Sequence, residues 1–114
     1  PKLFWVNWFR KSDDGKFLWP GFGDNSRVLK WVIDRVNGEG AANETAIGHV
    51  PTTSALDVDG LDIDADDLTT LLSVDNDAWR SEVELIRGHF ESIGERLPAA
   101  MRDELSDLEK RLAN

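Results

Sequence analysis

The sequence lacks cysteine entirely, and this absence excludes disulfide bridges, thiolate metal sites and cysteine nucleophiles. It also lacks any run of about 20 consecutive apolar residues, the length that a bilayer-spanning helix needs, and any recognisable secretion signal. Lysine and arginine are scarce, with 13 against 22 aspartates and glutamates. Long nucleic acids require a broad basic surface, so we do not expect a nucleic acid as partner. The lack of a long apolar run argues against a membrane as partner. A cysteine-free chain fits the reducing cytoplasm, where we expect this protein to work.

Charge and aromatic rings are unevenly distributed along the 114 residues, a length that suits one domain. Residues 1–31 hold six basic and three acidic side chains and eight of the ten aromatic residues, whereas residues 32–114 carry a net charge of −12. An aromatic, mildly cationic segment on an acidic body suits a small anionic ligand with a flat ring.

Residues 1–38 are expected to begin with an aromatic hairpin. Aromatic and β-branched residues at 3–9 predict a strand, the Asp14-Gly15 pair predicts a tight turn, and residues 16–19 predict a short return strand that ends at Pro20. The chain starts inside the first of these strands, and the further strands that would pair with it must come from elsewhere. We therefore expect it to be a piece of a larger protein.

A helix is expected to follow the hairpin after the connector Gly21-Phe22-Gly23. Its apolar spacing predicts residues 26–36, with Gly38 as the stop and with a cap from one of three polar side chains: Asp24, Asn25 or Ser26. Residues 39–74 predict a mostly irregular connector, with an extended segment at 47–51 and a brief helix at 66–72.

Residues 75–114 show the clearest periodicity in the chain, with a cap available from Asp75 or Asp77. Pro98 divides two amphipathic helices whose apolar residues recur every three or four positions, which predicts a helical pair. These residues are Trp79, Val83, Ile86, Phe90, Ile93 and Leu97, then Met101, Leu105, Leu108 and Leu112. The sequence therefore predicts an α+β fold, with an N-terminal β-hairpin region followed by a mainly α-helical C-terminal part.

Several familiar site patterns fail in this sequence. Gly21-Phe22-Gly23 before a helix resembles the start of the dinucleotide fingerprint, but Trp19-Pro20 stands where a buried strand is required. No G-x-x-x-x-G-K-[ST] phosphate loop occurs. The aspartates at 57–67 do not match a calcium loop in either register, and no catalytic triad or metal ligand set can be assembled.

Three phenylalanines leave two interpretations open. Phe9, Phe17 and Phe22 could wall a slot for a heterocycle, since stacking stabilises each base by about 1–3 kcal/mol. Alternatively they are ordinary core residues, and the pattern alone favours the core because most aromatic side chains are buried.

A resemblance bears on this choice. Residues 7–11 (NWFRK), 15–29 (GKFLWPGFGDNSRVL), 45–51 (TAIGHVP) and 55–61 (ALDVDGL), together with the closing helical pair, closely resemble the C-terminal region of GTP-dependent phosphoenolpyruvate carboxykinase. The resemblance covers essentially the whole chain. It implies a fragment of that family's larger α/β nucleotide-binding domain, in which residues 1–38, 39–74 and 75–114 are the three parts described above.

The resemblance also implies a function. The family converts oxaloacetate and GTP into phosphoenolpyruvate, GDP and carbon dioxide during gluconeogenesis, using Mn²⁺ and Mg²⁺. Its guanine slot is lined by phenylalanines that match Phe9, Phe17 and Phe22, and an asparagine that matches Asn25 contacts the guanine edge. Residues 22–25, which include Gly23 and Asp24, match the nucleotide-binding segment. The family usually has glutamate in place of Asp24, which leaves open whether that side chain affects nucleotide selectivity.

The family's phosphate loop, metal ligands and oxaloacetate-binding arginines have no counterpart in this chain. We therefore expect no catalytic or metal-binding residue here, a guanine-binding wall that works only with the rest of a carboxykinase chain, and a monomeric parent enzyme. The apolar edge of a strand at 3–9 predicts that the fragment alone self-associates. The alternatives are a stand-alone aromatic hairpin that binds a peptide, or a structural piece that docks on a partner.

Overall fold

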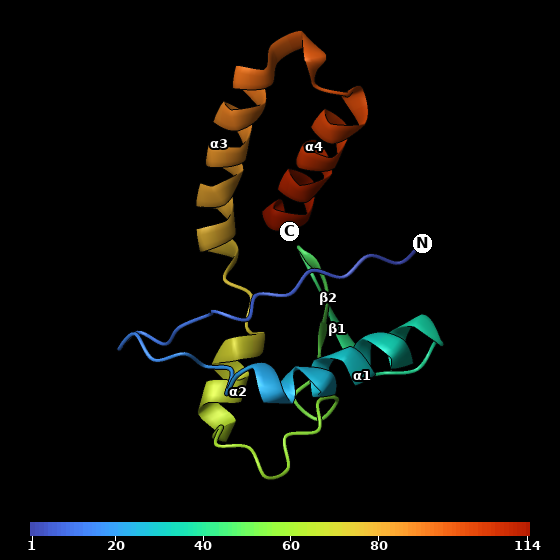
Figure 1. Cartoon of the computed structure of the whole chain (residues 1–114). Coiled ribbons are helices and arrows are strands. Elements are labelled where there is room, and N and C mark those ends of the chain that lie inside the picture. The colour runs from blue at the N-terminus through green and yellow to red at the C-terminus, as the bar shows by residue number, and fades with distance from the viewer. The chain divides into compact units, whose positions relative to one another are not determined.

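The computed structural model describes all 114 residues, and it combines helices with one small sheet (Figure 1). Its main elements are α1 (Asn25–Val36), β1 (Ala42–Thr45), β2 (Gly48–Pro51), α2 (Ala65–Leu72), α3 (Asn76–Ile93) and α4 (Ala99–Ala113), with short 3₁₀ turns at Phe22–Asp24 and Gly94–Arg96. The predicted α+β class is confirmed. No helix combines the length and the apolar character that a membrane crossing requires.

The chain divides into two compact units. The first contains residues 1–44 and 49–73, and the second contains residues 45–48 and 74–114. The tip of the β1–β2 hairpin, at residues 45–48, thus belongs with the C-terminal helices.

The core of the first unit forms around three buried side chains: Trp31 of α1, Leu68 of α2 and Leu56 from the loop before α2, which are 5%, 6% and 6% exposed. Trp31 also donates its indole N–H to the carbonyl oxygen of Ala41, at 3.0 Å, so the buried ring leaves no polar atom unpaired. The predicted helices at 26–36 and 66–72 are confirmed to within a residue at each end. Asp64 begins α2 by accepting a hydrogen bond from the backbone N–H of Asp67, at 2.7 Å.

The second unit is the predicted helical pair. Val83 of α3 packs with Leu105 and Leu112 of α4, and the neighbouring apolar side chains come from the positions that the spacing predicts: Trp79, Ile86, Phe90 and Leu108. Asp75 caps α3 as expected, accepting hydrogen bonds from the N–H groups of Asp77 and Ala78. The helix ends at Gly94, whose φ of 65° favours glycine, before Pro98 starts α4.

The prediction of a strand at residues 3–9 is wrong. These residues form no ladder, and the predicted return strand at 16–19 is reduced to one antiparallel bridge between Lys11 and Phe17. A strand needs a neighbour for its N–H and C=O groups, and no other segment of the chain pairs with residues 3–9. The strand edge expected to drive self-association is therefore absent, although Leu3 and Trp5 are 90% and 98% exposed.

The two-stranded sheet lies instead within the predicted connector. β1 and β2 form a hairpin closed by a two-residue turn, and Thr45 supports it by donating its hydroxyl to the carbonyl oxygen of Gly48, at 2.6 Å. Only β2 falls in a segment that the sequence predicts to be extended.

We predict that Leu112→Ala destabilises the helical pair by about 2–5 kcal/mol, because it removes a side chain that is 1% exposed and leaves a cavity between α3 and α4. Met101→Ala on the same helix is the control, since Met101 is 45% exposed. Urea denaturation followed by far-ultraviolet circular dichroism measures both variants. Equal losses of unfolding free energy would contradict this description of the core.

Candidate functional site

A tight turn brings two of the predicted site residues together. Gly15 N–H donates to the carbonyl oxygen of Ser12 and Ser12 N–H donates to that of Lys16, both at 2.9 Å, which confirms the predicted Asp-Gly turn. The ring centres of Phe9 and Phe17 lie 6.3 Å apart in an edge-on arrangement, with planes inclined by 65°. Such edge-on pairs are favoured by the aromatic quadrupole.

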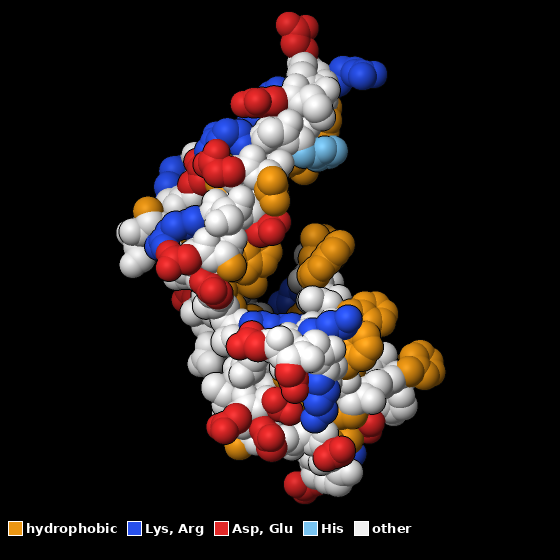
Figure 2. All heavy atoms as spheres, turned by 90° about the vertical axis from the view of Figure 1, so that its left-hand side faces the viewer, with side chains coloured by type: hydrophobic (Ala, Val, Ile, Leu, Met, Phe, Trp, Pro, Cys, Tyr) orange, Lys and Arg blue, Asp and Glu red, His pale blue; other side chains and the backbone are white.

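The three phenylalanines are not core residues. Phe9, Phe17 and Phe22 are 73%, 51% and 91% exposed, whereas their neighbours Leu18 and Trp19 are 3% and 5% exposed. Figure 2 shows hydrophobic side chains, in orange, standing out from the surface of the unit that contains α1 and α2. The interpretation of these rings as core, which the sequence pattern favours, is therefore wrong. Phe22 makes no ring contact with the other two.

Arg10 fixes the hairpin to the end of α2, a role that the sequence gives no sign of. Its guanidinium donates to the carbonyl oxygens of Leu71 and Ser73, at 3.0 and 2.8 Å, and to the hydroxyl of Ser73, at 3.0 Å. Carbonyl groups at a helix C-terminus lack partners within the helix. The arginine supplies partners to that end of α2 and holds the phenylalanine pair in place at the same time.

The segment before α1 depends on one glycine. Gly21 has φ 136° and ψ −175°, a region of the backbone map that is essentially restricted to glycine. Its carbonyl oxygen accepts a hydrogen bond from Asp24 N–H at 3.1 Å, and the resulting 3₁₀ turn at Phe22–Asp24 leads directly into α1. Phe22 is held at the exposed start of this turn.

Asp24 occupies the N-cap position of α1 but does not cap it. No side chain accepts a hydrogen bond from the first turn, and the Asp24 carboxylate instead lies 3.4 Å from Nε of Arg27. Arg27 also donates to the carbonyl oxygen of Asp57, at 2.9 Å. The predicted cap is therefore wrong, and the N–H groups of the first turn have no side-chain partner.

Asn25 is held by a tryptophan. The indole N–H of Trp19 donates to Oδ1 of Asn25 at 2.9 Å, and the Trp19 ring in turn packs at 6.4 Å from Trp8. The sequence gives no sign of this hydrogen bond, since a contact across six residues and a connecting loop leaves no periodic signal.

The basic residues around these rings are already engaged. Arg10 and Arg27 bind the groups described above, and Lys11 lies over the Phe17 ring with Nζ 4.9 Å from its centre. The other three basic side chains of residues 1–31 contact backbone or carboxylate oxygens: Lys2, Lys16 and Lys30. Each basic side chain of residues 1–31 therefore contacts another group of the protein. No group of three or more histidine, aspartate or glutamate side chains in the chain could hold a metal ion.

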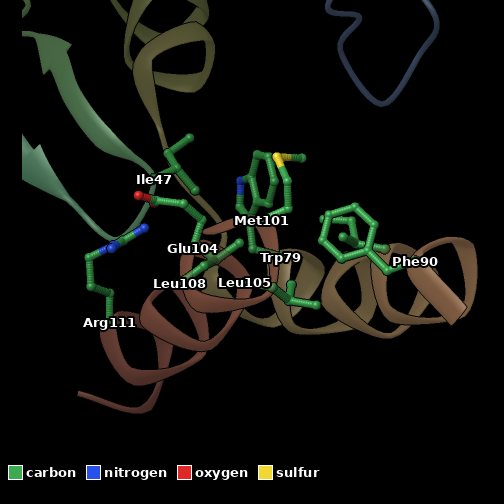
Figure 3. Close-up of a pocket in the computed structure, with 9 residues that line it drawn as sticks. Ile47, Trp79, Phe90, Met101, Glu104, Leu105, Leu108 and Arg111 are labelled. Atoms are coloured by element: carbon green, nitrogen blue, oxygen red, sulfur yellow. The ribbon is translucent and has the colours of Figure 1, made fainter. Parts of the chain in front are cut away.

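The second unit carries a separate apolar groove of about 300 Å³ between α3 and α4 (Figure 3). Trp79, Phe90 and Leu108 line it together with Ile47 from the hairpin tip, and its polar groups are Glu104 and Arg111. Arg111 is anchored there by donating to the carbonyl oxygen of Ala46, at 2.8 Å. None of the predicted site residues lies in this groove, and its composition suits contact with apolar groups rather than a nucleotide.

Comparison with known proteins identifies the family. The family described as "Phosphoenolpyruvate carboxykinase C-terminal P-loop domain" matches residues 1–111. The chain belongs to the GTP-dependent phosphoenolpyruvate carboxykinase family. Proteins named "Phosphoenolpyruvate carboxykinase [GTP]" from Neocallimastix frontalis, Treponema pallidum and Paenarthrobacter aurescens are 56%, 50% and 48% identical to it. Each match covers 98% of this chain but only 18% of the relative, so the chain spans about a fifth of the length of these relatives.

We predict that Gly21→Ala destabilises the carboxykinase fold by about 1–3 kcal/mol, because alanine is strained at φ 136°. Gly23→Ala is a matched control two residues away, where φ is ordinary and an added Cβ meets no atom within 4 Å. Urea denaturation of the two variants compares them directly. If Gly23→Ala lost as much stability as Gly21→Ala, the backbone strain at Gly21 would not be the cause.

Proposed function

We propose that this chain supplies the guanine-binding wall of a GTP-dependent phosphoenolpyruvate carboxykinase, which converts oxaloacetate and GTP into phosphoenolpyruvate, GDP and carbon dioxide. The relatives carry that enzyme's name. The observation that carries the proposal is the exposure of all three phenylalanines, Phe9 and Phe17 as a pair on the hairpin and Phe22 in the turn that leads into α1. Exposed rings are costly in water unless a ligand or partner covers them.

Each residue of the segment has a distinct part in the proposal. The phenylalanine rings stack on the guanine or close the sides of its slot. Gly23 has open space around the position of a side chain, so the base can approach the backbone there. Asn25 meets the base edge with its amide, which offers both a donor and an acceptor.

Asp24 contributes through its backbone. Its carboxylate lies 3.4 Å from Nε of Arg27, which leaves the backbone of Asp24 as the part that would meet the base. The aspartate that stands where the family usually has glutamate therefore leaves nucleotide selectivity unchanged.

The phosphates, the Mn²⁺ and Mg²⁺ ions and oxaloacetate are bound by other parts of the enzyme. The 114 residues hold no metal-ligand group, and their basic side chains near the rings are engaged elsewhere. The metals do not fit this part of the protein, and the chain alone is not catalytic. We place the complete enzyme in the cytoplasm, in gluconeogenesis.

The exposed apolar side chains at the N-terminal end also fit a part of a larger enzyme. Leu3 and Trp5 are almost fully exposed, and we assign them to packing against the remainder of a monomeric carboxykinase. In isolation the same side chains promote self-association.

We predict that Phe22→Ala, placed in a full-length carboxykinase in which these residues form the C-terminal part, weakens GTP binding by about 1–3 kcal/mol. The truncation removes a ring that is 91% exposed and free to stack. The KM for oxaloacetate should stay close to the wild-type value, because oxaloacetate is bound elsewhere. Isothermal titration calorimetry with GTP and steady-state kinetics provide the two measurements.

Leu29→Ala is the matched control for this experiment. Leu29 is an exposed apolar residue of α1, 53% accessible, and lies outside the proposed slot. Unchanged GTP affinity in Phe22→Ala, or an equal loss in Leu29→Ala, would contradict the guanine-wall proposal.

A further inference from the structure

The hydrogen bond between Trp19 and Asn25 determines which end of the asparagine amide is available. An indole N–H can donate but cannot accept, so the atom that faces it at 2.9 Å must be the amide oxygen. The NH₂ end of the Asn25 amide is then left to face a ligand. This orientation follows from the chemistry of the two groups, whereas an amide without such a partner could turn over freely.

The tryptophan that imposes this orientation is itself immobilised. Trp19 is 5% exposed, its ring packs against Trp8, and Pro20 restricts the backbone immediately after it. The preceding residue is fixed too, since Leu18 N–H donates to the carbonyl oxygen of Arg10 at 3.0 Å. Arg10 is in turn bound to the end of α2. The indole N–H is therefore a fixed donor on the scaffold of the first unit.

A fixed amide discriminates between purines at position 6. Guanine presents the O6 acceptor there, whereas adenine presents the N6 amino donor. An NH₂ group that cannot rotate away pairs with the oxygen of guanine and opposes the amino group of adenine. An amide free to turn by 180° would present its oxygen to adenine equally well.

We propose that Trp19 is a positioning residue for base selectivity: its indole N–H locks the Asn25 amide with the NH₂ group toward the base and thereby selects a 6-oxopurine over a 6-aminopurine. This inference rests on the proposed function, because it requires that Asn25 meets the base. Trp19 itself does not touch the nucleotide and acts only through Asn25.

The test uses Trp19→Phe in the full-length carboxykinase. Loss of the N–H frees the amide, so the preference for GTP over ATP, measured as the ratio of their dissociation constants, should fall about tenfold, the effect of one hydrogen bond of ordinary strength. The kcat at saturating GTP should change little, since the phosphates and the reacting groups are held elsewhere. Replacing Trp19 by benzothienylalanine, which keeps the shape of the ring and removes only the N–H, should give the same fall and separates the hydrogen bond from packing.

Trp31→Phe is the control. Trp31 is equally buried, at 5% exposed, and also donates one indole hydrogen bond, to the carbonyl oxygen of Ala41. It should keep the wild-type preference for GTP even if it loses stability. An unchanged preference in the benzothienylalanine protein, with Asn25→Ala losing GTP affinity, would overturn the role of Trp19 and leave the guanine wall intact. If Asn25→Ala and Phe22→Ala both bound GTP as the wild type does, the proposed function would fall as well.

Discussion

The rest of the candidate site depends on how the short turn at residues 11–17 is attached to the first unit. A single bridge pair cannot hold a hairpin in water, because isolated two-stranded hairpins are at best marginally stable. Burial of Leu18 and Trp19 supplies the apolar attachment, and the hydrogen bonds of Arg10 to the end of α2 supply the polar one. These contacts involve Leu18, Trp19 and Arg10, and not the two phenylalanine rings. They hold Phe9 and Phe17 in position while leaving both rings on the surface, an arrangement that a hairpin packed through its phenylalanines could not offer.

The exposed phenylalanine rings and the basic side chains near them have different roles in the structure. The first 31 positions of the sequence hold six basic and three acidic side chains, a distribution that suits a small anionic ligand. In the structure these side chains tie the segment to the acidic body: Arg27 joins the start of α1 to Asp57, and Lys16 lies 3.7 Å from Asp67. Ion pairs between basic side chains of residues 1–31 and acidic side chains of residues 32–114 thus help to hold the first unit together. Under the proposed function, flat contacts and directed hydrogen bonds rather than these basic side chains would hold the base of a nucleotide.

The helices could be predicted from the sequence because their signals are local. Spacing of three and four residues predicts α1, α3 and α4 to within a few residues, and Asp75 and Pro98 mark boundaries that the structure confirms. The strands could not be predicted in the same way, because a strand depends on a partner elsewhere in the chain. Residues 3–9 have strong β propensity, but propensity reports suitability for a pleated surface and requires a neighbour, which the chain does not provide. β1, with the sequence ANET, has a weak pattern and forms because a two-residue turn sets β2 against it.

The candidate site was predictable only in part, and for a related reason. Periodicity could not tell that Leu18 and Trp19 face inward while Phe17 and Phe22 face outward, because the segment between Phe17 and Phe22 turns at Gly21 and belongs to no regular element. The resemblance to carboxykinases predicts which residues form the site, but it does not supply the orientation of the Asn25 amide. That orientation comes from a buried ring whose only polar atom is a donor. Its chemistry makes it the neighbour that determines whether Asn25 presents its NH₂ group or its oxygen.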